Sequence, residues 1–393
     1  MKQLLSVLIG LLLIGGCARY QEDQPRQLGE ITSQGFVEQW RAPLTLDDGD
    51  ELQRGYLVGE TLYIYSGNNR VFALDPRGGQ LRHSNRIASA TSAVRRPTVQ
   101  GDYIIYPTRA SLEVYSRAGR HLKSVPMGHS IRSPGTGAGN IVYVGLDYPI
   151  GGRLAKIDIA RAYGHTVWEL MTDGGLSAAP VWYDDAIYVA SEGGTVYAVN
   201  AVRAPIWSTP GNVFRTDGPV VADIKVDDTG VYVASTDTKL YCIDRLTGRI
   251  KWQYYAGRPL TTPPVLTSDR VYQFVRGQGL VALDKRTGEP SRQPLWALDD
   301  AREFLAEDEA HTYVAMRDGR IAAVDRTSGE IRFRSQRRDF DVFVANTRDG
   351  MIYAARRDGT VIGVRPVLSP GAVGYIVQSE PSDLILEPVA AAE

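Results

Sequence analysis

A pair of short predicted strands recurs eight times along the chain, and this repeat restricts the possible folds more than any other feature. One copy reads TGVYVAST, from Thr229 to Thr236, followed by KLYCIDRLTG, from Lys239 to Gly248. The equivalent positions in the eight copies are Tyr63, Ile105, Tyr143, Tyr188, Tyr232, Tyr272, Tyr313 and Tyr353. Neighbouring copies are 38 to 45 residues apart. This period is close to the roughly 40 to 45 residues of a four-stranded propeller blade.

Each repeat has room for four strands. An upstream segment such as LSAAPVWY supplies the first, and the tyrosine-bearing strand is the second. A third strand such as TVYAV shows apolar–polar alternation, which is typical of strands. A D-x-x-x-G turn leads to the fourth, because Asp bonds to nearby backbone and Gly tolerates positive φ. We therefore predict an all-β chain of four-stranded antiparallel blades, whose radial repetition leaves only short edges.

The predicted fourth strand ends in an aromatic residue in most copies. We expect this flat side chain to pack between neighbouring blades, where an indole N–H can reach a backbone carbonyl. His83 takes this place in the first copy, and Lys123 in the second. The predicted blade-docking residues are Trp40, Trp168, Trp207, Trp252, Trp296 and Phe333.

The two ends of the repeat array complement each other. The eighth copy stops at Arg365-Pro366 without a fourth strand, whereas GFVEQW, from Gly35 to Trp40, is a fourth strand without a blade. If the two pair, both chain ends meet in one blade and the ring closes. The predicted fold is an eight-bladed β-propeller over residues 35–366, closed by an N-terminal strand.

The N-terminus has the pattern of an export signal. Lys2 is followed by an apolar run from Leu4 to Ile14, which is too short to span a bilayer but typical of a signal peptide. LIGGC, ending at Cys17, resembles the lipobox of bacterial lipoproteins. That resemblance implies a signal peptide over 1–16, lipid chains on Cys17, and a lipid-anchored linker over 17–34. The alternative is an ordinary signal peptide with a chance cysteine. Ala18, directly after that cysteine, implies an outer-membrane destination facing the periplasm.

The last 27 residues, 367–393, do not continue the repeat. They are rich in Pro and Ala, acidic, and without a fourth-strand pattern. Segments of this kind bury too little apolar surface to fold alone, so we expect a mostly disordered tail.

Composition and motifs give no sign of catalysis. The formal net charge of −1 gives no electrostatic attraction to nucleic acid. Neither acidic stretch, Asp47–Glu51 nor Asp299-Asp300, has calcium-loop spacing. The histidines do not have the spacing of metal ligands. Cys242 lies within a predicted strand, and we expect it to be a small buried core residue. We therefore predict no catalytic residues, no cofactor and no metal. The histidines are His83, His121, His129, His165 and His311.

Arginines recur in the upstream strands that would line the central channel. Several of them together would make a positive channel mouth and a possible interaction surface. The alternative is that they point outward or pair with acids such as Asp341 and Glu303. The residues are Arg54, Arg95, Arg96, Arg132, Arg215 and Arg302.

The repeat signature, seen in CIDRLTGRIKW from Cys242 to Trp252, is similar to that of enzymes that use pyrroloquinoline quinone (PQQ). Those enzymes hold the quinone over calcium, in many cases beside a disulfide of adjacent cysteines, and carry long insertions between strands. This chain has two cysteines, far apart, and no such insertions. A PQQ-dependent dehydrogenase is therefore the alternative rather than the main hypothesis.

The lipobox, eight repeats and this length together resemble the BamB family over roughly residues 1 to 366. BamB is the lipoprotein subunit of the outer-membrane β-barrel assembly machinery. The resemblance implies a non-enzymatic scaffold whose partners are the barrel-forming outer-membrane subunit and unfolded outer-membrane clients. The partner-contacting loop of that family has no matching segment here, and the tail is extra. A propeller scaffold in another envelope complex is a further alternative.

Overall fold

The computed structural model describes residues 35–366, except 162–163, 287–292 and 336–338. Cys17, the predicted signal peptide, the linker and the C-terminal tail lie outside the described residues. Among the described residues, no helix has the length and apolar character needed to cross a membrane.

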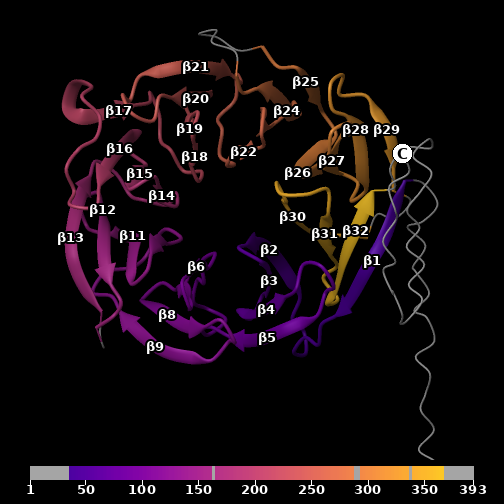
Figure 1. Ribbon diagram of the computed structural model, residues 1–393, viewed down its shortest axis with the longest axis horizontal. Helices are drawn as coiled ribbons and strands as arrows, with labels where there is room; N and C mark the ends of the chain where they lie inside the picture. The colour runs from indigo at the N-terminus through magenta and orange to yellow at the C-terminus, as the bar shows by residue number, and fades with distance from the viewer. Residues whose placement is uncertain (1–34, 162–163, 287–292, 336–338, 367–393) are drawn as a thin grey trace, which may run out of the picture.

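The described chain forms eight four-stranded antiparallel sheets arranged as blades around a centre (Figure 1). This confirms the predicted eight-bladed β-propeller. Blade one consists of β2(Leu52–Val58), β3(Thr61–Ser66), β4(Arg70–Leu74) and β5(Leu81–Arg86), and blade two of β6(Thr98–Gln100), β7(Tyr103–Pro107), β8(Ser111–Ser116) and β9(His121–Pro126). Blade three consists of β10(Thr136–Ala138), β11(Ile141–Asp147), β12(Gly152–Asp158) and β13(His165–Thr172). Blade four consists of β14(Val181–Tyr183), β15(Ala186–Ala190), β16(Thr195–Asn200) and β17(Val213–Arg215).

The remaining blades follow the same order from the inside of the ring outward. Blade five consists of β18(Lys225–Asp227), β19(Gly230–Ala234), β20(Lys239–Ile243) and β21(Ile250–Tyr255), and blade six of β22(Val265–Leu266), β23(Arg270–Val275), β24(Gly279–Asp284) and β25(Trp296–Leu298). Blade seven consists of β26(Ala301–Glu307), β27(His311–Met316), β28(Ile321–Asp325) and β29(Ile331–Arg334). Blade eight consists of β30(Val342–Val344), β31(Ile352–Ala355), β32(Thr360–Pro366) and β1(Phe36–Pro43). A short 3-10 helix, Pro210–Asn212, precedes β17.

The ring is closed by the N-terminal strand, as predicted. β1 pairs antiparallel with β32, from Phe36 opposite Pro366 to Pro43 opposite Thr360, with one irregularity between Glu38 and Trp40. The first described strand thus completes the last blade, and both ends of the array are held by one sheet.

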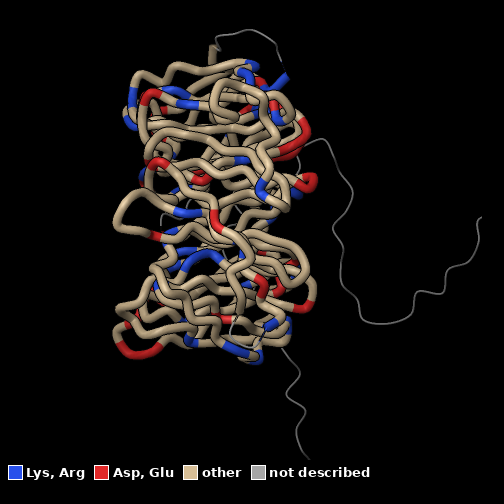
Figure 2. Tube along the Cα trace, turned by 90° about the vertical axis from the view of Figure 1, so that its left-hand side faces the viewer, with Lys and Arg blue, Asp and Glu red and all other residues tan. Residues whose placement is uncertain are grey.

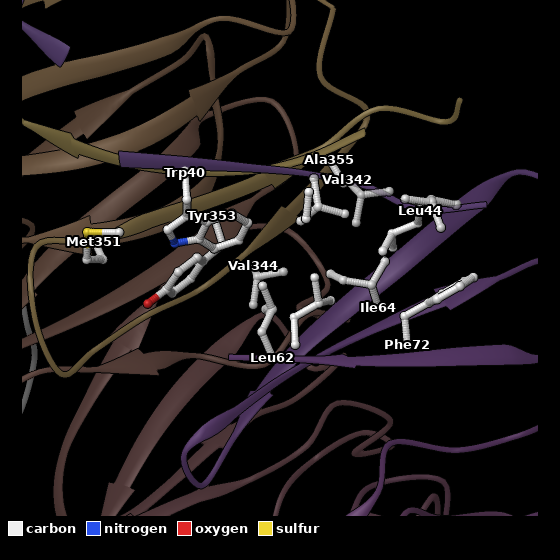
Figure 3. Packing of buried hydrophobic residues seen from close by; sticks show 14 residues of the cluster. Trp40, Leu44, Leu62, Ile64, Phe72, Val342, Val344, Met351, Tyr353 and Ala355 are labelled. Carbon is white, nitrogen blue, oxygen red and sulfur yellow. The ribbon is translucent and has the colours of Figure 1, made fainter. Parts of the chain in front are cut away.

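The core lies between neighbouring blades. Strands such as β15 and β19 are buried along their whole length, because each blade is covered on both faces. Third strands such as β20 and β28 are also buried almost throughout, so the predicted apolar–polar alternation is weak there, whereas β8 and β12 partly keep it. Figure 3 shows the interface between blades eight and one, where Trp40, Tyr353 and Val344 lie close to Leu62 and Ile64.

The aromatic residues between blades share one hydrogen-bonding scheme. In four of them the indole N–H donates to the carbonyl of the residue directly after the Asp or Asn that opens the next blade's turn. The bonds are Trp40 to Pro76 (3.0 Å), Trp168 to Ala201 (3.0 Å), Trp207 to Arg245 (2.8 Å) and Trp296 to Arg326 (3.0 Å). In blade two the ammonium of Lys123 donates to the equivalent carbonyl, that of Ile159. A cation thus replaces the indole at this place in the repeat.

The glycine that ends the Asp-containing turn also lies against the docking aromatic residue of the preceding blade. Gly248 has φ +74°, and a Cβ added there would lie 2.7 Å from the indole of Trp207. Glycine is therefore needed twice, for a left-handed backbone and for the close approach of the indole. The turn is held by Asp244, whose carboxylate accepts from the amides of Leu246 and Thr247. The same pairing recurs between Gly79 and Trp40, Gly329 and Trp296, and Gly35 and Phe333.

The placement of one docking residue, Trp207, differs from the simple repeat. Trp207 lies in the segment before β17 rather than in the fourth strand, because residues 201–212 form a longer connection there. Trp252 lies in β21, is 1% exposed and stands 5.9 Å from the Tyr232 ring. The docking role of all six residues stays a prediction, and Trp207 is taken up in the Discussion.

Candidate interaction surfaces

A cavity of about 690 Å³ lies in the central channel. It is bordered by the first strands of blades one, five, six, seven and eight. Three basic and three acidic side chains line it, so it has no strong overall charge. They are Arg96, Lys225, Lys285, Asp223, Asp227 and Glu303.

One ion pair crosses this channel. A guanidinium nitrogen of Arg96, in the segment before blade two, lies 3.4 Å from the carboxylate of Asp223, in the segment before blade five. Asp223 also accepts a hydrogen bond of 2.7 Å from the backbone amide of Ala179. Because these blades are three places apart in the ring, the pair ties together distant parts of it.

A second ion pair is more deeply buried. The Lys285 ammonium, 7% exposed, lies 2.5 Å from Asp227, and it also donates to the carbonyl of Thr267 at 2.7 Å. Burial opposes ionisation of Asp227, but hydrogen bonds from Lys285 and Thr229 outweigh it and lower the pKa of the carboxyl.

We expect Asp227→Asn to destabilise the protein by about 2 kcal/mol at neutral pH, the size of a hydrogen bond to a charged group. Because the folded pKa of Asp227 is depressed, its contribution is complete above the usual Asp pKa of about 3.9 and is lost as pH falls through the lower folded value. Urea unfolding from neutral to acid pH should show the gap between wild type and variant closing only in acid. Asp102→Asn, at an exposed turn, is the control. A gap that stays constant with pH contradicts the prediction.

Only part of the predicted arginine set lies at the inner strands of the ring, and its role at the channel mouth stays a prediction. Arg54 lies on β2, and Arg95 and Arg132 lie a few residues before the first strands of blades two and three. Arg302, on β26, pairs with Glu303 at 2.9 Å, as the alternative interpretation expected. Asp341 instead pairs with Arg357.

The prediction that Arg215 lines the channel is wrong. It lies on β17, the outermost strand of blade four, where its guanidinium is 3.2 Å from Asp173. The wrong placement of Arg215 comes from the long connection between β16 and β17. This connection moves the fourth strand of blade four further along the sequence, to where the repeat period would place the first strand of blade five. Figure 2 shows acidic and basic residues interspersed over the side of the ring rather than separated.

Exposed apolar side chains occur in blade three, on its outermost strand and in one of its connections. Ile150, in the β11–β12 connection, is 89% exposed, and Met171, on β13, is 65% exposed. Nearby, the ring of His129 stacks on Tyr148 at 3.7 Å, and Tyr148 donates to Glu169 of β13. We call His129, Tyr148, Ile150 and Met171 the blade-three patch. Sequence reasoning missed it, although the adjacent Pro149-Ile150 in a predicted turn was an available signal.

The side chains a calcium-bound quinone would need do not come together in the described part of the chain. There, no three His, Cys, Asp or Glu residues are grouped so that they could hold a metal ion. Asp47, in the first acidic stretch, pairs instead with Arg70 and Arg86. His121 contacts Glu113, and His311 lies 3.6 Å from Asp308.

Comparison with known proteins shows that the sequence of this chain is similar to that of BamB over part of its length. A family model described as outer membrane protein assembly factor BamB matches residues 203–306. The BamB of Nitrosomonas eutropha is 26% identical over 197 residues, which cover 45% of this chain and 46% of that protein. The match thus spans about half the length of the curated relative.

Solved structures extend the likeness in fold to most of the chain. BamB from Moraxella catarrhalis superposes with a TM-score of 0.64 at 20% identity, covering 84% of this chain and 97% of that one. The computationally designed protein Ika8 gives 0.64 at 15% identity, covering 84% of this chain and 99% of that one. The C-terminal WD40 domain of Sif2 gives 0.60 at 15% identity, covering 80% and 96%. Blade architecture alone is therefore widely shared, whereas both sequence matches are to BamB: the chain is a β-propeller that resembles BamB in its PQQ-type repeats.

Proposed function

We propose that this chain is a non-enzymatic scaffold, anchored by lipid on Cys17 to the outer membrane and facing the periplasm, that aids assembly of outer-membrane β-barrel proteins. The observation that carries the proposal is the coincidence of sequence and fold likeness to BamB, a protein named as an assembly factor for outer membrane proteins. The predicted lipobox supports the location, since several lipid chains on one residue anchor firmly. A propeller serving another envelope complex is the competing outcome.

The surface of the ring supports a role in protein contacts. The outermost strands β5, β9, β13 and β21 each have one unpaired edge and carry exposed apolar side chains. Such edges are templates for strand addition by an extended partner segment. The blade-three patch combines an edge strand with Ile150, the most exposed large hydrophobic residue of the described chain. We propose this patch as the contact with the barrel-forming subunit.

The test is recovery of partners with the lipidated full chain from its native outer membrane. We expect the barrel-forming subunit to be recovered with wild type, and Ile150→Asp with Met171→Asp to lower its recovery about tenfold or more, equivalent to about 1.4 kcal/mol or more of binding free energy. Leu246→Asp, an exposed apolar residue (63%) on a blade-five turn, is the matched control and should bind normally.

The outcomes separate the parts of the proposal. If wild type recovers no barrel-forming subunit but does recover another envelope complex, the assembly function is wrong. If wild type and the patch variant recover equal amounts of the barrel-forming subunit, the function stands and the patch is not the contact.

A further inference from the structure

The inner strand of blade six is shorter than those of the other blades. β22 spans only Val265–Leu266, whereas the other described first strands have three or seven residues. Pro263 and Pro264 come directly before it, and proline has no N–H to donate to a strand ladder. The pairing with β23 is therefore short, and part of β23 is left uncovered on the inner side of the blade.

A pocket of about 370 Å³ lies at this place, between blades six and seven. Phe274 and Phe304 line it together with Tyr272, whose ring lies 4.7 Å from that of Phe304. The Tyr272 hydroxyl is already engaged by Glu307 at 2.7 Å and by Thr312 at 2.9 Å, so Tyr272 contributes its ring to the pocket wall rather than a free hydroxyl. The other apolar lining residues are Pro263, Val265, Leu280 and Ala345.

A buried amide holds this wall in place. The equivalent position in the neighbouring blades is aliphatic, Val233 and Val314, but in blade six it is Gln273, which is fully buried. The Gln273 amide donates to the backbone carbonyl of Thr262 at 3.0 Å, and Thr262 itself lines the pocket. A side-chain hydrogen bond thus fixes the connection that strand pairing leaves free, and the pocket is formed without a ligand, as most binding pockets are.

The charged side chains of the pocket form a single neutral pair. Arg302 and Glu303 both line it, because an irregularity between Ala301 and Glu303 in β26 interrupts the alternation of side chains. Their charged groups are 2.9 Å apart. Beyond this pair, neither side chain makes a hydrogen bond with another residue of the described ranges. The pair therefore has N–H groups to donate, carboxylate oxygens to accept, and no net charge.

The pocket opens toward the central channel. Four of its lining residues, Pro263, Val265, Glu303 and Ala345, also border the channel cavity of about 690 Å³. The Glu303 side chain is 45% exposed, so the neutral pair lies where the pocket meets the channel. Because acids and bases also balance in the channel cavity, neither space favours a ligand with a strong net charge.

A peptide group beside an aromatic side chain matches these features. Aromatic rings pack favourably edge-to-face or offset against other rings, and three rings line this pocket. A peptide carbonyl can accept from the Arg302 guanidinium, and a peptide N–H can donate to the Glu303 carboxylate. A charged ligand would instead meet one like charge for each opposite charge.

We propose that this pocket binds an aromatic side chain of an extended, unfolded polypeptide, whose neighbouring peptide group bonds to Arg302 and Glu303. The choice of partner rests on the proposed function, since the clients of an assembly scaffold are unfolded chains, and strands of outer-membrane barrels carry aromatic residues at both membrane interfaces. The pocket belongs to blades six and seven, and the blade-three patch lies on another part of the ring. A client and the barrel-forming subunit can therefore bind at the same time.

The test uses the full chain reconstituted in phosphatidylcholine vesicles. The probe is a short neutral peptide, acetylated and amidated, with one tryptophan among serine and threonine residues. We expect NMR line broadening of the tryptophan resonances to give a Kd on the order of 100 µM to 1 mM. The same peptide with alanine in place of tryptophan should bind at least about tenfold more weakly. Vesicles without protein give the background.

A substitution that fills the pocket locates the site. Ala345→Trp puts a large side chain at an exposed position where pocket and channel meet, and should weaken peptide binding by at least about tenfold. Thr347→Trp is the matched control, since Thr347 is also exposed and borders the channel cavity but not the pocket. This control should bind within about twofold of wild type. Circular dichroism of both variants checks folding.

The neutral pair is tested separately. Arg302→Ala with Glu303→Ala should weaken binding of the tryptophan peptide about fivefold or more, because both hydrogen bonds to the peptide group are lost. Free indole, which has no peptide group, should bind this double variant and wild type equally. Equal peptide binding by the double variant and wild type would contradict the assignment of the peptide group to this pair.

Three results overturn the proposal: binding no stronger than to empty vesicles, equal binding of the tryptophan and alanine peptides, or equal loss in Ala345→Trp and Thr347→Trp. Binding of free indole without binding of the peptide shows a site for a small molecule and also overturns the polypeptide as occupant. The function is scored separately, by recovery of the barrel-forming subunit from the native membrane. Normal recovery without peptide binding removes the pocket proposal alone, whereas peptide binding without recovery removes the assembly function alone.

Discussion

Trp207→Ala is expected to lower the free energy of unfolding by about 3 to 5 kcal/mol, the usual cost of removing a large aromatic side chain from a core. The side chain is 1% exposed, its N–H donates to the Arg245 carbonyl at 2.8 Å, and its ring lies 6.1 Å from that of Tyr188. These contacts join blade four to the turn of blade five. Chemical denaturation followed by circular dichroism, which does not depend on the tryptophan that is removed, measures the change.

Two further variants separate the causes of that loss. Trp207→Phe keeps most of the ring but loses the N–H, and the Arg245 carbonyl still accepts from the Tyr188 hydroxyl at 3.2 Å, so we expect a loss of only about 1 kcal/mol. Val202→Ala, 78% exposed in the connection after β16, should change stability by less than about 0.5 kcal/mol. If Trp207→Ala is as mild as Val202→Ala, the indole does not hold the two blades together.

The repeat period predicted the fold because every blade has the same kind of strands and turns, packed against its neighbours in the same way. A strand pair with buried Tyr188 or Tyr232 and a turn such as Asp244 to Gly248 recurs often enough for its spacing to reveal eight blades. Closure was also predictable, since a strand lacking a blade and a blade lacking a strand stand at opposite ends of the array.

Contacts between blades were harder to predict because they join residues about 40 positions apart without fixed chemistry. Lys123 appeared to break the aromatic pattern, yet its ammonium reaches the carbonyl of Ile159 as an indole would. The sequence also assigns the turn glycine only a backbone role, whereas Gly248 touches Trp207 of the preceding blade. Arg215 was misplaced for a related reason, since an irregular connection shifts the strand and the periodic pattern then points to the wrong element.

The double role of the turn glycine leads to the second large effect. We expect Gly248→Ala to cost about 2 to 5 kcal/mol, from about 1 to 2 kcal/mol of left-handed backbone strain and about 1 to 3 kcal/mol of overpacking against Trp207. Gly49 is a matched control, because it has the same φ of +74° but no atom within 4 Å of an added Cβ. Gly49→Ala should therefore cost only the backbone strain, and chemical denaturation of both variants gives the difference.

A double-mutant cycle tests the cause directly. When Trp207 is already Ala, the methyl group of Gly248→Ala has no indole to meet, and the second substitution should cost no more than Gly49→Ala does in the wild type. The two substitutions would then be non-additive by about 1 to 3 kcal/mol, as expected for residues in contact. Strict additivity would mean that Gly248 is needed for its backbone conformation alone, and that the recurrence of glycine at this turn reflects the shape of the turn rather than the packing of one blade on the next.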